Sequence, residues 1–202
     1  MELSECISMT KDIIVALAAV STVIIAYMGL NKWKAELKGK VYFDTARNLI
    51  KVVYKVRDQI RLVRSSFMLD YEFPSDYNPL DKNAEKKANA YVYLYQNRMK
   101  PLRDSLQELD VYVLEYEALW DNDIKEKAKK LSNLFFQLES SIKMYIEDVR
   151  TNGEFFRKNE KLEIEIWNNI HESLKQDDML SLEINNSITE IEKIVRPHLD
   201  NS

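Results

Sequence analysis

The feature that most constrains this 202-residue chain is a run of eighteen residues near its start without a charged side chain. The run covers residues 13–30 and reads IIVALAAVSTVIIAYMGL. As an α-helix with a rise of about 1.5 Å per residue it measures roughly 27 Å, close to the ~30 Å hydrocarbon core of a bilayer. The hydroxyls of Ser21 and Thr22 can bond to carbonyls one turn back in such a helix. We therefore predict a transmembrane helix at residues 13–30.

Two other interpretations of the run are a cleaved signal peptide and a buried core helix of a soluble protein. A signal peptide has a basic leader and a shorter apolar region. The residues before this run are instead acidic overall, because Lys11 is outnumbered by Glu2, Glu5 and Asp12. Eighteen uncharged residues in a row are also long for a core helix. The sequence favours a membrane span over both alternatives.

Basic residues lie mainly on the C-terminal side of the run. Only Lys11 precedes it, whereas four lysines follow closely: Lys32, Lys34, Lys38 and Lys40. The positive-inside rule then places residues 1–12 outside, as a short extracytoplasmic tail, and residues 31–202 in the cytoplasm. We expect Tyr27 and Trp33 to anchor the helix in the headgroup layer, where the lysines also attract anionic headgroups. Cys6 would lie on the outer side, either as an idle thiol or paired with a second copy.

Glycine is scarce, since Gly29, Gly39 and Gly153 are the only three in the chain. A dinucleotide-binding fingerprint needs three clustered glycines, and a P-loop needs two followed by lysine and Ser/Thr. Neither can be assembled here, and a barrel or sandwich of short strands would need more turn residues. One cysteine and two histidines exclude a disulfide framework and a structural zinc site of Cys/His type. The composition indicates an all-α protein, and we predict no cofactor.

Apolar residues recur at alternating spacings of four and three in residues 42–67, 91–120 and 124–149. This periodicity is typical of long helices that bury one face. Less regular patterns suggest a fourth helix near residues 155–174, where LEIEIW also alternates like a strand, and a fifth that ends near Pro197. We predict an N-terminal transmembrane helix followed by an antiparallel bundle of four to five long helices over residues 31–202.

Polar and breaker residues predict where these helices begin and end. Asn78-Pro79 offers a cap followed by a proline in the first turn, and Asp123 with Glu126 resembles a capping box. Asn152-Gly153 can end the third helix, and Asp177-Asp178 can cap the fifth. Pro101 falls inside the second periodic stretch, so we expect a kink or a division of the helix there.

The net charge of −4 conceals a basic first cytoplasmic helix followed by acidic ones. The most informative basic residues are Arg57, Arg61 and Arg64, which form a candidate anion or partner contact. In one interpretation they pair with carboxylates of the neighbouring helices. In another they bind phosphate, either of a nucleotide or of nucleic acid. Aromatic residues do not alternate with the basic ones as base stacking would require, which counts against nucleic acid.

Within the predicted span, small residues recur at every fourth position: Ala18, Thr22 and Ala26. Small residues at this spacing let two membrane helices approach closely. The pattern therefore permits a homo-oligomer formed by the spans.

Known arrangements of catalytic and metal-binding residues are missing from the sequence. A di-metal bundle needs Glu-x-x-His pairs, but Asn168 precedes His171 by three residues and Val195 precedes His198. The acidic loop from Asp70 to Asp81 lacks the spacing and the central glycine of a calcium-binding hand. We therefore predict neither a metal site nor an enzyme.

Two segments after the span carry a family resemblance. They read Trp33-Lys34-x-Glu36-Leu37-x-Gly39-Lys40 and Tyr54-x-x-Arg57-Asp58-x-Ile60. They resemble a loose group of uncharacterised bacterial proteins that combine an N-terminal span with a cytoplasmic helical domain. The resemblance covers residues 33–65 and implies tethering to a bacterial inner (plasma) membrane, without implying an activity or functional residues.

These features lead to three hypotheses about function. The first is a non-enzymatic, membrane-tethered interaction or sensor module that binds an unidentified protein partner in the cytoplasm. The alternative is a membrane-perturbing effector in bacterial stress or phage defence, whose copies assemble through their spans. The third is a phosphate- or nucleic-acid-binding module that uses the basic first cytoplasmic helix.

Overall fold

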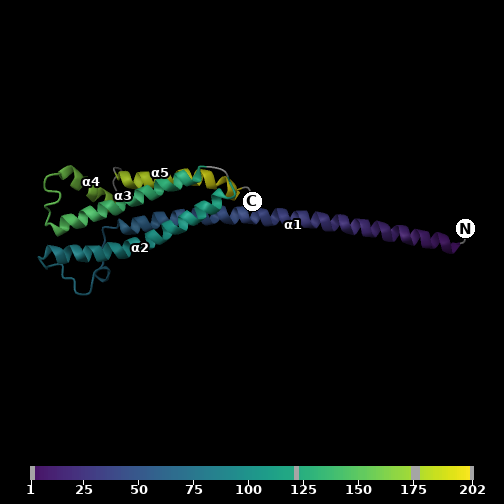
Figure 1. Cartoon of the computed structure of the whole chain (residues 1–202), viewed down its shortest axis with the longest axis horizontal. Coiled ribbons are helices and arrows are strands. Elements are labelled where there is room, and N and C mark those ends of the chain that lie inside the picture. Colours follow the sequence, from purple (N-terminus) through teal and green to yellow (C-terminus); the bar gives the residue numbers. More distant parts are fainter. Residues whose placement is uncertain (1–2, 121–122, 174–177, 201–202) are drawn as a thin grey trace. The chain divides into compact units, whose positions relative to one another are not determined.

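The computed structural model describes residues 3–120, 123–173 and 178–200, with side chains from residue 9 onward. Every regular element in these ranges is helical, as predicted (Figure 1). The elements are α1 (Leu3–Val63), the 3-10 turn η1 (Asp70–Glu72), α2 (Ala84–Glu117), α3 (Ile124–Arg150), α4 (Glu160–Ile170), α5 (Met179–Val195) and the single turn α6 (Pro197–Asp200). The chain divides into two compact units, Met1–Asp44 and Thr45–Asn201, which we describe separately.

The unit Thr45–Asn201 is built around one hydrophobic core. The last turns of α1 and the helices α2, α3 and α5 line this core with residues such as Leu49, Leu102, Leu131 and Ile191. α3 packs against α2, α4 and α5, and α2 and α3 run in opposite directions (Figure 1). Most core residues of α1, α2 and α3 follow the four-and-three periodicity, because that spacing keeps one face of each helix turned inward. Ile50 and Val52 are buried beside this series on α1, whereas Phe67, the last residue of the first periodic stretch, lies beyond the end of α1 and is 72% exposed.

Several helix ends fall where the sequence predicts them. Asn152 and Gly153 adopt positive φ angles of 54° and 83° just after α3, so the pair ends this helix as expected. The Asp178 side chain accepts a hydrogen bond from the Ser181 N–H and caps α5, whereas Asp177 lies outside the described residues. α3 begins after Asp123, as predicted, although Asp123 makes no side-chain cap hydrogen bond.

Two helix starts differ from the predictions. α2 begins at Ala84 rather than at Pro79, because Asn78 forms a tight turn in which its side chain accepts from the Leu80 N–H. Asn83 is the true cap, and its side chain accepts from the Lys86 N–H. α4 begins at Glu160, so Phe155 and Phe156 belong to the preceding turns, and the LEIEIW segment is helical.

Two long helices are also more continuous than expected. α1 covers both the predicted span and the helix that follows it, since no proline occurs before Pro74. Pro101 lies inside α2 without dividing it. The Ser105 hydroxyl donates to the Pro101 carbonyl, and the proline itself is exposed, so its ring displaces no core side chain.

Candidate functional site

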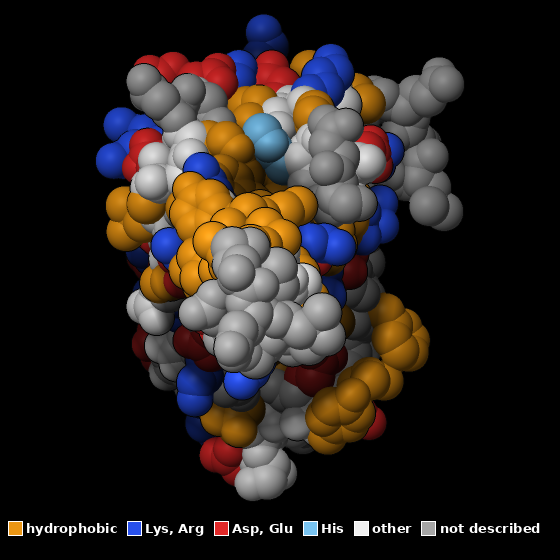
Figure 2. All heavy atoms as spheres, turned by 90° about the vertical axis from the view of Figure 1, so that its right-hand side faces the viewer, with side chains coloured by type: hydrophobic (Ala, Val, Ile, Leu, Met, Phe, Trp, Pro, Cys, Tyr) orange, Lys and Arg blue, Asp and Glu red, His pale blue; other side chains and the backbone are white. Residues whose placement is uncertain are grey.

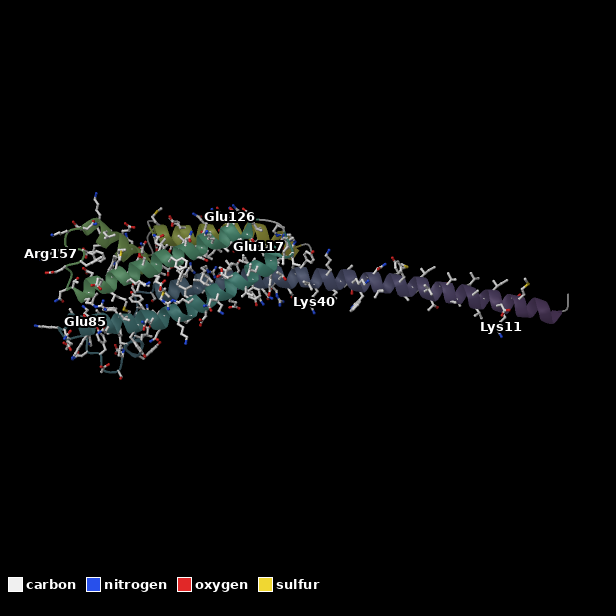
Figure 3. All side chains as sticks on the ribbon, viewed as in Figure 1. Lys11, Lys40, Glu85, Glu117, Glu126 and Arg157 are labelled. Atoms are coloured by element: carbon white, nitrogen blue, oxygen red, sulfur yellow. The ribbon has the colours of Figure 1, made fainter. Side chains whose placement is uncertain are left out.

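The uncharged stretch of α1 is the most conspicuous functional candidate in the unit Met1–Asp44. By length and composition, α1 is the one helix in the described ranges apolar enough to cross a membrane, and its 18-residue window of highest mean hydropathy, 2.5, is 0% buried. Figure 3 labels Lys11 and Lys40, which lie on either side of this stretch. The view from the N-terminal side shows hydrophobic side chains gathered on the face turned to the viewer (Figure 2). A core helix of a soluble protein buries such side chains, whereas those of this window are exposed.

The two aliphatic hydroxyls within the stretch form hydrogen bonds inside the helix. Ser21 Oγ donates to the Leu17 carbonyl at 2.8 Å, and Thr22 Oγ1 donates to the Ala18 carbonyl at 2.8 Å. This confirms the expectation that both hydroxyls bond one turn back. The segment can therefore enter lipid without leaving the Ser21 or Thr22 hydroxyl unpaired.

The predicted span face and anchors all lie on the helix surface. Ala18, Thr22 and Ala26 are exposed and spaced by one turn, which keeps them on one side of α1. Tyr27, Trp33 and the four lysines that follow the span, Lys32, Lys34, Lys38 and Lys40, are exposed as well. Lys38 Nζ lies 5.3 Å from the centre of the Tyr42 ring. Their roles in membrane contact and span pairing stay predictions.

The three candidate arginines do not form one site. Arg57 lies over the Tyr54 ring and donates to its neighbour Asp58, while Arg61 pairs with Glu172 at 3.4 Å and is half exposed. Arg64 is only 1% exposed. The structure therefore separates a buried Arg64 from two surface arginines whose carboxylate partners compete with any anion.

Arg64 is the centre of a buried polar network where α1 ends. Its guanidinium donates to the Asp178 carboxylate at 2.8 and 3.0 Å and to the Ser181 hydroxyl at 2.6 Å. It also donates to the carbonyls of Asn168, Asn169 and His171, at the C-terminal end of α4. The Arg64 carbonyl accepts from the Glu172 N–H. These bonds commit the guanidinium to joining α1, α4 and α5, so it acts within the fold rather than toward a soluble anion.

Asp178 is the ionised partner in this network. Burial opposes its ionisation, but hydrogen bonds from Arg64 and from the Ser181 and Ser173 N–H groups outweigh burial and lower the pKa of Asp178. The carboxylate therefore balances the charge that Arg64 carries into the interior. The same carboxylate caps α5, which couples the buried ion pair to the start of that helix.

A second buried arginine, Arg98, is absent from the candidates above. It donates to the Glu72 carboxylate at 2.7 and 2.8 Å and to the carbonyls of Ser65 and Phe67 at 2.7 Å. The Arg98 hydrogen bonds lower the pKa of Glu72. The sequence signal for this site is the spacing of Arg98, four residues from both Leu94 and Leu102, which places it on the apolar face of α2.

His171 lies next to the Arg64 network, a position that its sequence neighbours do not indicate. Its Nδ1 is 3.2 Å from the Ser66 hydroxyl, and its ring centre lies 4.2 Å from that of Trp167, beside a cavity of about 330 Å³. Burial and the charges of Arg64 and Arg98 lower the pKa of His171, so the imidazole is neutral at pH 7. A neutral imidazole can accept a serine proton, but catalysis also needs a donor for the developing negative charge. The nearby Arg64 guanidinium does not supply such a donor, because its N–H groups bond to acceptors within the protein.

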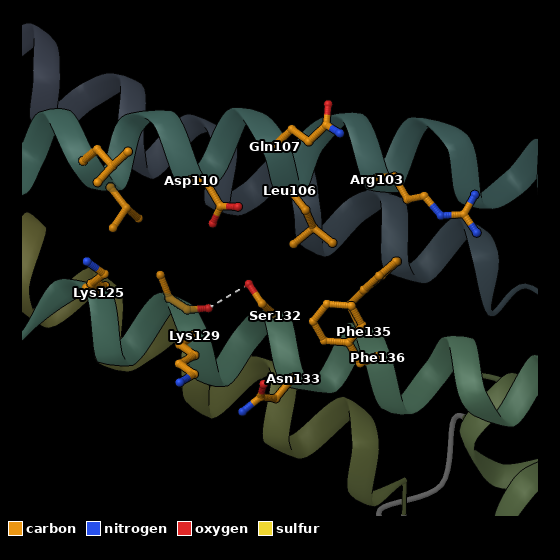
Figure 4. A pocket seen from close by; sticks show the side chains of 13 residues that line it. Arg103, Leu106, Gln107, Asp110, Lys125, Lys129, Ser132, Asn133, Phe135 and Phe136 are labelled. Atoms are coloured by element: carbon orange, nitrogen blue, oxygen red, sulfur yellow. Dashed lines mark hydrogen bonds between the residues drawn. The ribbon is translucent and has the colours of Figure 1, made fainter.

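A groove between α2 and α3 forms a cavity of about 590 Å³ (Figure 4). Its floor is apolar and includes Leu106, Val113 and Phe135, while Leu114 and Phe136 are more than half exposed at its rim. Charged side chains flank it, with Arg103 and Asp110 on α2 and Lys125 and Lys129 on α3. No cluster of three or more His, Cys, Asp or Glu residues that could hold a metal ion occurs within the described ranges.

Comparison of this chain with protein-family models, with curated proteins and with solved structures gave no match.

Proposed function

We propose that this chain is a non-enzymatic interaction module that is anchored in a bacterial inner membrane by α1 and carries a helical bundle on the cytoplasmic side. The single observation that supports anchoring is the uncharged stretch of α1, whose side chains find no cover in the protein. Burial of an apolar side chain in lipid is worth about 1.5–3 kcal/mol for Val, Leu or Ile, so a stretch rich in these residues strongly favours insertion.

The orientation and the interaction role rest on further features. Four lysines follow the stretch and one precedes it, which supports an outer N-terminus and a cytoplasmic bundle. In the bundle, the two buried arginines are committed to internal acceptors, while the α2–α3 groove leaves Leu114 and Phe136 exposed. A rigid domain with an exposed apolar groove suits binding of another protein better than chemistry.

Carbonate extraction of membranes tests anchoring. We expect the full chain to stay in the pellet and Val20→Asp plus Val23→Asp to move to the supernatant, since each carboxylate costs about 2.5–3.5 kcal/mol at a helix centre. Val20→Leu plus Val23→Leu is the matched control and should stay in the pellet. Release of the unchanged chain by carbonate would overturn the proposal, as would loss of residues 13–30 from the mature protein by mass spectrometry.

Protease treatment of spheroplasts tests the orientation. The C-terminal unit should resist added protease until the membrane is opened by detergent. Digestion of this unit in intact spheroplasts would place it outside and contradict the proposal.

A further inference from the structure

The α2–α3 groove has exposed apolar side chains and a regular pattern of facing residues. On α2 its lining includes Arg103, Gln107, Asp110 and Leu114, spaced by four, three and four residues. On α3 it includes Lys125, Lys129, Ser132 and Phe136, again spaced by four, three and four. Both helices therefore present a second interaction seam, in addition to the seam that they bury in the core.

The antiparallel course of α2 and α3 sets these two seams in register. Asp110 lies at the level of Lys129, and Arg103 lies at the level of Phe136 (Figure 4). The four-residue spacings then put Leu114, one turn after Asp110, at the level of Lys125, one turn before Lys129. The remaining level pairs Gln107 with Ser132. One level thus pairs opposite charges, and another pairs two polar groups. The two outer levels each pair a cation with an apolar side chain.

Asp110 and Lys129 are the two members that matter most for recognition. Both are exposed, and neither takes part in an ion pair within the described residues. The neighbouring bases are used in part inside the chain, as Arg103 pairs with Glu139 at 2.9 Å and Lys125 with Glu117 at 3.6 Å. The central level of the groove therefore offers one carboxylate and one ammonium for contacts outside the chain.

We infer that the occupant of this groove is a second copy of the chain, related by a twofold axis that runs parallel to α2 and α3. Such an axis keeps every residue at its own level and places α2 of one copy opposite α3 of the other. Asp110 then meets Lys129 of the partner copy twice, Arg103 meets Phe136, and the exposed Leu114 packs on the stem of Lys125. The same surface complements itself in charge and in apolar contact, which a twofold interface requires.

This inference rests on the interaction role proposed for the α2–α3 groove and names its partner, and it concerns a different part of the chain from the span. Pairing through Ala18, Thr22 and Ala26 uses none of the groove residues, so the tests below change residues of the groove itself. They use the full chain in detergent, which makes them independent of whether the protein is membrane-anchored.

Charge exchange is the first test, with the mass of the complex measured by sedimentation. Asp110→Lys alone and Lys129→Asp alone should each weaken self-association at least about tenfold, because like charges then meet at both symmetric contacts. An equimolar mixture of the two variants should restore pairing, because opposite charges meet again at both contacts between one variant and the other. Both positions are exposed, so circular dichroism should show unchanged helix content.

Disulfide trapping locates the interface. In a Cys6→Ser background, a mixture of Asp110→Cys chains and Lys129→Cys chains should cross-link on mild oxidation. Asp104→Cys mixed with Gln137→Cys is the control. Both residues are exposed, and Asp104 on α2 lies at nearly the level of Gln137 on α3, but neither lines the groove. Cross-linking of the control pair to the same extent would overturn the inference. So would a monomeric wild-type chain, or a mixture of the charge variants that fails to pair.

Discussion

At the scale of single residues, the fold depends on two arginines that carry their charge into the interior. Arg64 and Arg98 lie at 1% and 5% exposure, and each meets a carboxylate and several backbone carbonyls. A buried ion pair contributes little net stability over apolar residues of the same volume, but removing one partner leaves an uncompensated charge. These arginines therefore fix which segments meet: α1 with α4 and α5 through Arg64, and the chain after α1 with α2 through Arg98.

Replacement of Arg64 should be far more costly than replacement of its neighbour on α1. We expect Arg64→Met to lower the free energy of unfolding by about 3–5 kcal/mol, because Asp178 stays buried without its cation. Arg61→Met, one turn earlier, removes a half-exposed pair and should cost no more than about 1 kcal/mol. Denaturant unfolding of the two variants measures the difference.

A second substitution distinguishes charge from packing as the cause. Arg64→Met plus Asp178→Leu removes both charges and should regain part of the loss, although α5 then lacks its cap. The single variant Asp178→Leu gives the cost of losing the carboxylate alone. If the double variant is less stable than Arg64→Met by that whole cost, the two losses are additive, and the buried ion pair is not the source of the effect.

At the scale of elements, periodicity and capping predict a large part of the structure. The four-and-three spacing gives the buried faces of α1, α2 and α3, since burial follows the helix period whatever the neighbours are. Asn152-Gly153 and Asp178 mark helix ends because their conformations and hydrogen bonds are local. Asn78-Pro79 misleads because Asn83 offers an equally good cap five residues later, and local sequence does not rank the two.

The roles of Arg64, Arg98 and His171 could not be read from the sequence in the same way. Arg64 meets Asp178 across 114 residues, and Ser66 meets His171 across 105. Such contacts depend on how the helices pack, which periodicity does not specify. Pro101 shows the converse case, in which tertiary packing keeps α2 continuous against a strong local preference.

Substitution of Pro101 should show how much the proline inside α2 lowers the free energy of unfolding. Alanine restores an N–H that can donate to the carbonyl of Asn97 and removes the steric conflict of the ring with that turn. We expect Pro101→Ala to raise the free energy of unfolding by about 1–3 kcal/mol, measured by thermal or denaturant unfolding. Lys100→Ala, at the adjacent exposed position, should change it by no more than about 0.5 kcal/mol. Equal stability of Pro101→Ala and the unchanged chain would mean that α2 bears no strain at this proline.

At the scale of the whole molecule, the polar junction around Arg64 joins α1, α4 and α5, and it makes the stability of the unit Thr45–Asn201 depend on pH. His171, Arg64 and Asp178 meet there, and a positive charge on His171 would face the guanidinium of Arg64. Acidification therefore acts first on the histidine and only later on the carboxylates. The free energy of unfolding should therefore depend on the histidine in one pH range and on the carboxylates in a lower one.

The pKa of His171 is lower in the folded chain than its usual value of about 6.5, so the unfolded chain binds the proton more readily. The free energy of unfolding should thus fall as pH is lowered below about 6.5. The pKa values of Asp178 and Glu72 are lower than their usual values of 3.8 and 4.5, so these groups contribute stability above about pH 4.5 and lose it only at lower pH. His171→Gln should flatten the profile between about pH 5 and 7 and retain the decline below about pH 4, when unfolding is followed by circular dichroism at fixed ionic strength. If the free energy of unfolding of His171→Gln still falls as steeply between about pH 7 and pH 5, the pH dependence belongs to a group outside the junction.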